Sequence, residues 1–245
     1  MEEVKVAIFP KLLPMKARAV NTIVATGAHE ALPLADAHLI THYPTSLIDI
    51  RTLRDGRRLT LRPVLPQDAR LLAALINGLS DTSRQQRFPN ARQPATPAEL
   101  AALTCVDYRR HLAVVVSVQE DGRERLVAEA RYLIDDDGHA EVALVVDDPW
   151  QRSGIGTWAM FTLSRAADAA GAGWLRGEVL AGNTAMLALM RRCRFCCTVD
   201  RTDPDIVHVE TRPRALNAHR RAGPARPLGW VQRLLGAGQT AATQY

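Results

Sequence analysis

The apolar pattern between residues 58 and 212 predicts seven strands. Runs at residues 59–63, 111–118, 125–133, 140–146, 174–180, 196–200 and 206–210 are alternating or continuously apolar and have strand length. Asp121-Gly122 and the segment 135–138 (Asp-Asp-Asp-Gly) provide turns between the second, third and fourth runs. We therefore expect these three runs to form an antiparallel meander.

Helical spacing of apolar residues predicts four helices, which begin near Pro66, Thr96, Gly154 and Asn183. Thr96, with Pro97 next and Glu99 three positions on, has the pattern of a capping box. Residues 83–94 are polar and rich in arginine, so we expect a loop there.

The segment 140–159 combines a strand, a turn and a helix start. Residues 142–146 form a short apolar run, and the turn residues at 147–149 end it. Gly154 and Gly156 then open a helical pattern. Because the first N–H groups of a helix have no partners within the helix, and glycine lets a ligand approach closely, this segment predicts a phosphate-binding site.

Residues 151–156, Gln-Arg-Ser-Gly-Ile-Gly, match the signature Q/R-x-x-G-x-G/A, and the chain resembles the GCN5-related N-acetyltransferases (GNAT). The resemblance implies a mixed α/β fold with a mostly antiparallel, twisted sheet of about seven strands, splayed at the cofactor site and flanked by about four helices. It also implies acetyl-CoA as cosubstrate and no metal. The binding residues expected from it are Leu144, Val145, Val146, Gln151, Arg152, Ser153, Gly154, Ile155, Gly156, Thr157 and Asn183.

Further segments resemble the acyltransferase domain of the bacterial Pat-type protein lysine acetyltransferases. They are Leu79-Ser80, Ser83-Arg84, Arg87-Phe88, residues 97–100 (Pro-Ala-Glu-Leu) and residues 106–108 (Val-Asp-Tyr). The resemblance covers about residues 58–212 and implies transfer of an acetyl group to lysine side chains of proteins. A small-molecule amine as acceptor and a non-catalytic acyl-CoA-binding or sensing module are the alternatives.

Two residues depart from the family's pattern in the segment 183–195. Met190 stands where many relatives have a tyrosine, whose phenol acts as general acid toward the leaving thiolate. Arg194 stands where relatives have a glycine in a left-handed turn, which costs on the order of 1 kcal/mol for a residue with a β-carbon.

Glu141 is the candidate catalytic base. It precedes the buried run at the position where protein-acetylating relatives place their catalytic glutamate, and a carboxylate beside an apolar strand is expected to have a raised pKa. Pairing with a cross-strand arginine such as Arg131 is the alternative. Glu129 is a second candidate base, and Asn183 is expected to help place the pantetheine arm or a chain of waters.

Two other interpretations of the glycine loop are open: a dinucleotide site, since residues 154–159 also read Gly-x-Gly-x-x-Ala, and a helix start without a ligand. A dinucleotide turn follows its strand almost at once, whereas here residues 147–153 intervene. An acidic residue is then expected at the end of the next strand, and Glu178 lies inside that strand.

Charge and composition limit the possible partners. The net charge of +5 comes from five arginines after Pro213, because the other 26 basic residues balance 26 acidic ones. We expect residues 1–57 to be a poorly ordered extension, 58–212 the acetyltransferase domain, and 213–245 a basic, largely disordered tail. A short helix around Trp230 and Leu234 is possible within this tail. Nucleic-acid binding is the weakest reading, since only the tail is basic.

The four cysteines, three of them at 193, 196 and 197, are not spaced like a secreted disulfide framework and suit a reducing cytoplasm. Cys193, Cys196 and His208 could form half of a zinc site, but no second pair follows. No signal peptide and no apolar stretch of membrane-spanning length is evident, so we expect a cytoplasmic protein without a membrane partner.

Overall fold

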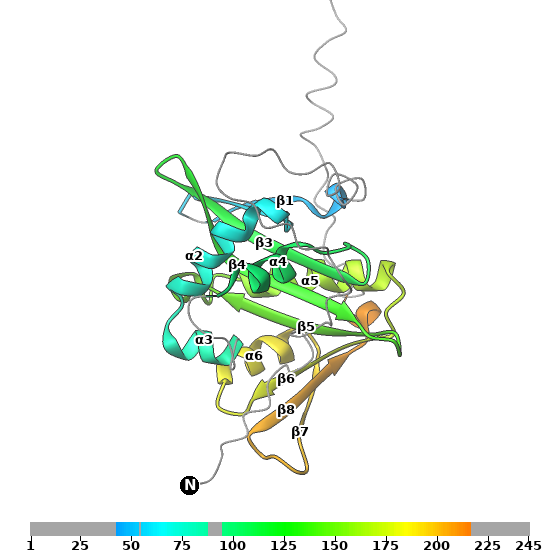
Figure 1. Ribbon diagram of the computed structural model, residues 1–245. Coiled ribbons are helices and arrows are strands. Elements are labelled where there is room, and N and C mark those ends of the chain that lie inside the picture. Colours follow the sequence, from blue (N-terminus) through cyan, green and yellow to red (C-terminus); the bar gives the residue numbers. More distant parts are fainter. Residues whose placement is uncertain (1–42, 54, 88–94, 217–245) are drawn as a thin grey trace, which may run out of the picture.

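The computed structural model describes residues 43–53, 55–87 and 95–216, and its centre is an eight-stranded sheet in the order β1-β2-β3-β4-β5-β6-β8-β7 (Figure 1). All neighbours are antiparallel except β5 and β6, which are parallel. The strands are β1 (Asp49–Thr52), β2 (Arg58–Pro63), β3 (His111–Glu120), β4 (Arg123–Ile134), β5 (His139–Val146), β6 (Trp174–Leu180), β7 (Cys196–Val199) and β8 (Ile206–Thr211). The helices are α2 (Ala69–Gly78), α3 (Asp81–Arg87), α4 (Pro97–Thr104), α5 (Ile155–Ala169) and α6 (Thr184–Arg192), with single 3₁₀ turns η2 (Thr45–Leu47), η3 (Pro66–Asp68) and η4 (Asp148–Trp150). The mixed, mostly antiparallel architecture is as expected from the sequence.

Two elements were not expected. β1 adds an eighth strand by pairing with β2. Its four residues are half-buried or exposed, so it has no apolar alternation that would reveal a strand. α3 replaces part of the expected loop at 83–94, and it was missed because its sequence, Asp-Thr-Ser-Arg-Gln-Gln-Arg, has no apolar residue.

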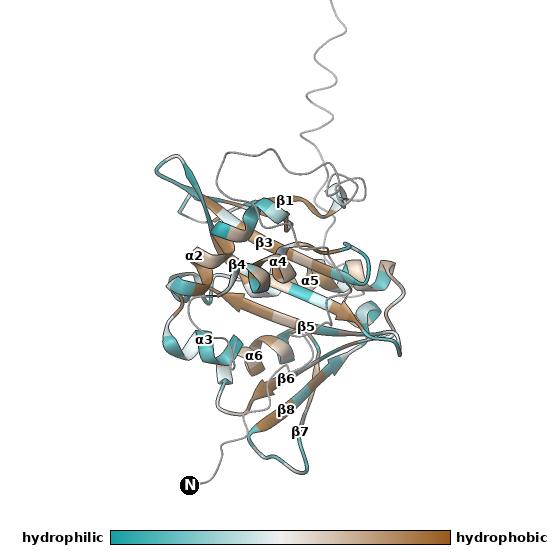
Figure 2. Ribbon diagram, viewed as in Figure 1, coloured by the Kyte–Doolittle hydropathy of each residue, from teal (hydrophilic) through white to brown (hydrophobic). Residues whose placement is uncertain are grey.

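Apolar side chains from both faces of the sheet form two cores. On one face, α5 packs on β3, β4 and β5 through residues such as Trp158 and Leu163, and α6 packs on β7 and α5. On the other face, α2 and α4 contribute Leu72, Ile76 and Leu103. Since β3, β4 and β5 are covered on both faces, they are nearly continuous apolar runs, with one hydrophilic stretch inside them (Figure 2).

The parallel pair β5 and β6 is joined over only three residue pairs. His139 pairs with Trp174, Ala140 with Leu175, and Glu141 with Arg176. Beyond Glu141 the described strands diverge, so residues 142–146 of β5 remain paired on the β4 side alone. The sheet therefore splays at β5, as the family resemblance implied.

The packed part of the chain extends past residues 58–212 at both ends. Asp49 of β1 accepts a 2.9 Å hydrogen bond from the Trp158 indole, and the Arg51 guanidinium lies 4.3 Å from the centre of that ring. At the other end Leu216 is buried, and Ser164 donates to the Pro213 carbonyl at 2.9 Å. The rest of the tail, including the segment around Trp230, lies outside the described residues.

Candidate active site

The loop before α5 presents N–H groups that have no partner within the helix. Gly154 is the N-cap in a left-handed conformation (φ 88°), and Arg152 is also left-handed (φ 60°). The first intrahelical bond runs from Trp158 N–H to the Gly154 carbonyl at 3.0 Å, so the three preceding N–H groups, those of residues 155–157, lack intrahelical acceptors. With the helix dipole, such a helix start attracts an anion.

Gly156 is required for close packing rather than for its backbone angle. A β-carbon at Gly156 would lie 3.0 Å from Leu189 Cδ2 of α6 and 3.3 Å from Leu144 Cδ2 of β5. Because the glycine has no side chain, the start of α5 can approach both elements at the floor of the site.

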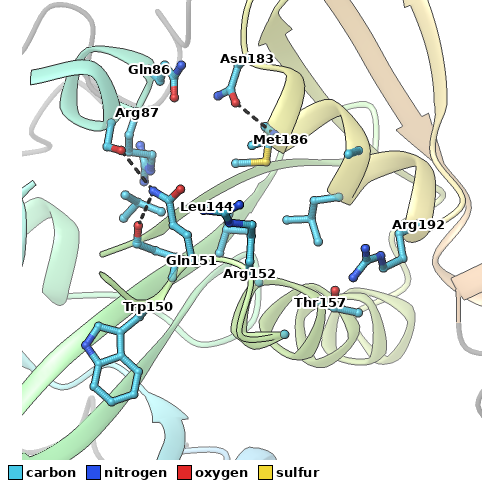
Figure 3. A pocket seen from close by; sticks show the side chains of 18 residues that line it. Gln86, Arg87, Leu144, Trp150, Gln151, Arg152, Thr157, Asn183, Met186 and Arg192 are labelled. Carbon is cyan, nitrogen blue, oxygen red and sulfur yellow. Dashed lines mark hydrogen bonds between the residues drawn. The ribbon is translucent and has the colours of Figure 1, made fainter. Parts of the chain in front are cut away.

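A pocket of about 440 Å³ opens over this loop, between α3 and α6 (Figure 3). Nine of the residues expected at the cofactor site line it: Leu144, Val145, Val146, Gln151, Arg152, Gly154, Gly156, Thr157 and Asn183. Two others do not. The Ile155 side chain is buried in the core, and the Ser153 hydroxyl donates to the Trp150 carbonyl at 2.5 Å, which stabilises the loop.

The remaining lining residues were missed in the sequence. They are Ser83, Gln86 and Arg87 on α3, Trp150, and Ala185, Met186, Ala188, Leu189 and Arg192 on α6. The α6 residues recur at helical spacing after Asn183, a signal that could have placed them on one face. No comparable signal exists for α3. Asn183 is the N-cap of α6, and its Oδ1 accepts the Met186 N–H at 3.0 Å.

Positive charge surrounds the pocket. In Figure 3, Arg87 lies on one side, Arg192 on the other, and Arg152 between them. No acidic side chain lines the pocket among the described residues. An anionic ligand with several phosphates fits this distribution of charge.

Asp148 joins the loop to the start of α3. Its carboxylate accepts hydrogen bonds from Ser80 N–H at 3.0 Å, Ser80 Oγ at 3.0 Å and Ser83 Oγ at 2.7 Å. Gln151 Nε2 lies 3.3 Å from both Asp148 and Ser83. Burial acts to raise the pKa of Asp148, but the hydrogen bonds from Ser80 and Ser83 outweigh it and hold the pKa below its usual value.

Behind the pocket, Glu129 of β4 is buried between two arginines. It accepts from Arg131 Nε at 2.6 Å and from Arg87 Nη2 at 3.1 Å. Arg131 also donates to the Leu103 carbonyl at 3.0 Å and lies 3.2 Å from His111 Nε2. Burial acts to raise the pKa of Glu129, and the two guanidiniums lower it below its usual value. A 1% exposed carboxylate with a lowered pKa suits a base less well than the half-buried Glu141.

Glu141 is half-buried at the last paired position before β5 and β6 diverge. It does not line the large pocket, but it shares a face of β5 with Ala143, which borders a second, smaller cavity. Arg131, the alternative partner of Glu141, forms an ion pair with Glu129, and both of these residues lie on β4. The structure thus places Glu141 next to the splay, and its role as base remains a prediction.

The smaller cavity, of about 30 Å³, lies where β5 and β6 part. Gln86, Arg87, Leu144, Asn183 and Met186 line both cavities and mark their junction. Met190 lines the smaller cavity and is 3% exposed, so the family's phenol position is filled by an apolar side chain. Arg194 has φ 63°, the left-handed conformation expected from the family's glycine.

The described cysteines give no zinc arrangement. Cys193 is buried while Cys196 is exposed, and His208 Nε2 lies 2.6 Å from Asp200. Within residues 43–53, 55–87 and 95–216, no cluster of three metal-ligating side chains occurs. No helix in these ranges is both long and apolar enough to cross a lipid bilayer.

Comparison with known proteins agrees with this geometry. Residues 58–196 match the acetyltransferase (GNAT) domain family. The chain therefore belongs to the GNAT family, and it is an N-acetyltransferase.

Its relatives include Pat-type proteins. It is 32% identical over 160 residues to acetyltransferase PA5475 of Pseudomonas aeruginosa, covering 64% of this chain and 83% of that protein. It is 35% identical over 173 residues to acetyltransferase Pat of Mycolicibacterium smegmatis, covering 66% of this chain and 50% of that protein, so it spans about half of this relative. The GNAT domain of S. lividans PAT has the same fold, with a TM-score of 0.61 at 22% identity over 69% of this chain and 99% of that domain.

Proposed function

We propose that the protein transfers the acetyl group of acetyl-CoA to lysine side chains of other proteins. The observation that carries the proposal is the start of α5, where unpaired N–H groups and three arginines face a pocket that leads to the splayed edge of β5. The alternative of a dinucleotide site fits less well, because β5–α5–β6 is the single parallel unit of the described sheet.

The pocket fits coenzyme A in composition. The N–H groups of residues 155–157 and the side chain of Arg152 would hold the pyrophosphate, and Arg192 would hold a further phosphate. Leu144, Val145 and Val146 give an apolar wall along the unpaired edge of β5, where the pantetheine arm would bond to the main chain. Following the strand away from the loop, the thioester would reach the junction with the smaller cavity.

Glu141 would accept the proton of the attacking amine. The nitrogen lone pair forms the new C–N bond, the carbonyl electrons move to oxygen and return as the C–S bond breaks, and the sulfur leaves as thiolate. Met190 has no proton to donate, so the thiolate takes a proton from water or the one that Glu141 received. The products are an amide and free coenzyme A.

Lysine as acceptor is supported by the relatives named Pat and by the resemblance of residues 58–212 to their acyltransferase domain. The four cysteines form no disulfide with one another, which agrees with a cytoplasmic location.

Incubation with acetyl-CoA and a panel of proteins, followed by mass spectrometry, tests this function. We expect acetyl-lysine at defined sites and release of coenzyme A in equal amount. Coenzyme A release with small amines but no acetylated protein would favour a small-molecule acetyltransferase. Binding of acetyl-CoA in calorimetry without any transfer would favour a sensing module.

A further inference from the structure

Arg87 is the charged side chain at the junction of the two cavities. Of the five residues that line both, only Arg87 carries a charge, and it is 6% exposed. It ends α3, whose start is fixed to Asp148. The guanidinium is therefore placed beside the point that the thioester would reach.

Packing does not explain this position. Arg87 is the one buried residue of α3, so the helix covers the pocket without adding apolar contacts. Burying a guanidinium costs free energy, and a buried ion pair is seldom more stable than an apolar pair of similar size. The arrangement therefore points to a use for the charge itself.

Glu129 is shared by Arg87 and Arg131, which hold different positions around it. Burial, with a smaller effect of Arg131, lowers the pKa of His111 to about 4, so this ring is neutral near pH 7. Arg131 is directed to Leu103 and His111 inside the protein, whereas Arg87 borders the cavities.

Glu141 is the other carboxylate that acts on Arg87: burial lowers the pKa of this guanidinium below its usual value, and Glu129 and Glu141 act against that shift. Glu141 lies on β5, next to β4, and on the same face of the sheet as Glu129. The wall of the junction thus holds a cation next to the proposed base, an arrangement suited to a reaction in which a proton leaves nitrogen as negative charge grows on oxygen.

We propose that Arg87 contacts the thioester carbonyl and stabilises the negative charge that develops on its oxygen, and that Glu129 is a positioning residue that holds the guanidinium there. This inference rests on the proposed function. Arg87 neither gives nor takes a proton: the carbonyl electrons move toward it as the amine attacks and return when the C–S bond breaks.

Kinetics and binding of Arg87→Gln, Arg87→Lys and Glu129→Gln test the proposal. For Arg87→Gln we expect kcat to fall about 100-fold, since loss of one donor to such an oxygen typically costs 100- to 1000-fold. We expect its Kd for coenzyme A, measured by calorimetry, to stay within about threefold, because the phosphates bind at the far end of the pocket. Arg87→Lys keeps the charge and should retain about a tenth of kcat.

Glu129→Gln keeps the shape of the side chain while removing its charge. We expect kcat to fall about tenfold with little change in KM, because the Arg87 guanidinium would be held less firmly against the carbonyl oxygen in the transition state. Arg84→Gln, on the same helix but outside both cavities, is the matched control and should keep wild-type kcat.

A kcat of Arg87→Gln equal to that of Arg84→Gln would overturn the inference. So would an effect confined to the Kd for coenzyme A, which would make Arg87 a phosphate ligand. If Arg87→Gln does not fold, the kcat of folded Arg87→Lys decides in the same way. If the wild-type protein transfers acetyl to no acceptor, the proposed function fails first, and the two failures remain distinct.

Discussion

Glu141 and Glu129 show how position decides the chemistry of two carboxylates on adjacent strands. Glu129 is enclosed by two arginines, whereas Glu141 stands half-buried at the end of the paired part of β5. Of the two, Glu141 is the one that borders the splay between β5 and β6. The base is therefore expected at Glu141.

Glu141→Gln should reduce kcat by about 100-fold or more, because the amine then has no carboxylate to take its proton. The Kd for acetyl-CoA should change by less than about twofold, since the helix start proposed to hold the phosphates is untouched. Steady-state kinetics together with calorimetry checks both values. Near-normal turnover would remove Glu141 from the role.

Arg194 carries backbone strain that a single substitution relieves. With φ 63°, a side chain costs roughly 1 kcal/mol relative to glycine. We expect Arg194→Gly to raise the free energy of unfolding by up to about 1 kcal/mol in urea titration. Arg194→Ala keeps the strain and is the control; equal gains in both variants would point to the lost side chain instead.

His111 should make stability depend on pH. Its pKa is about 4 in the folded protein, against about 6.5 for an unperturbed histidine, so the unfolded chain binds a proton that the folded one refuses. Stability is therefore lost as the pH falls from about 6.5 to 4, by about 2 kcal/mol between pH 7 and pH 5. Between pH 7 and pH 5, the free energy of unfolding of His111→Gln, measured with urea, should fall by about 2 kcal/mol less than that of the wild type. An equal fall in both proteins would contradict the prediction.

At the scale of elements, α3 is held by polar contacts at both ends. Its start bonds to Asp148 and its last residue to Glu129. Helices of this kind open locally more readily than helices with an apolar face. The wall that α3 forms thus depends on a few hydrogen bonds.

Asp148→Ala should loosen α3. Loss of these bonds, worth about 1 kcal/mol or more together, should speed amide hydrogen exchange in residues 81–87 by roughly tenfold. Exchange in α2, which has an apolar face, should not change. Because the pKa of Asp148 is lowered in the fold, its contribution is present above the usual carboxyl pKa and is lost as pH falls below it, so wild-type α3 should also loosen in acid.

The elements that the sequence predicted correctly are those with an apolar period. The strands β2 to β8, the helices α2 and α4 to α6, and the capping box at Thr96 follow from local pattern. β1 and α3 do not, because pairing with β2 and contacts to Asp148 and Glu129 create them. The same holds in the site: eight of the nine expected lining residues came from the single stretch 140–159, while Arg87 meets Glu129 across 42 positions of the chain.

At the scale of the whole molecule, the folded unit is larger than the segment that resembles the family. β1 adds the hydrogen bond between Asp49 and Trp158, and Leu216 is buried in the core on the face of the sheet that α5 covers. Both lie outside residues 58–212, so both ends of the unit contribute to its stability.

A fragment of residues 58–212 should therefore melt about 10 °C below a fragment of residues 43–216. Loss of β1 and of a buried leucine removes about 3 kcal/mol or more, and each kcal/mol shifts the Tm by roughly 2–4 °C in a domain of this size. Differential scanning calorimetry gives the comparison. Equal melting temperatures would show that the shorter segment folds without these contacts.

Because β5 and β6 pair over so short a length, bound coenzyme A would also contribute to the stability of the sheet. Three residue pairs connect β1–β5 to β6–β8–β7, and the main chain beyond Glu141 has no neighbouring strand on that side. A pantetheine arm bonded there would act as a brace across the gap. By linkage, the free energy by which bound coenzyme A stabilises the contact between the two parts of the sheet equals the free energy by which that contact strengthens coenzyme A binding.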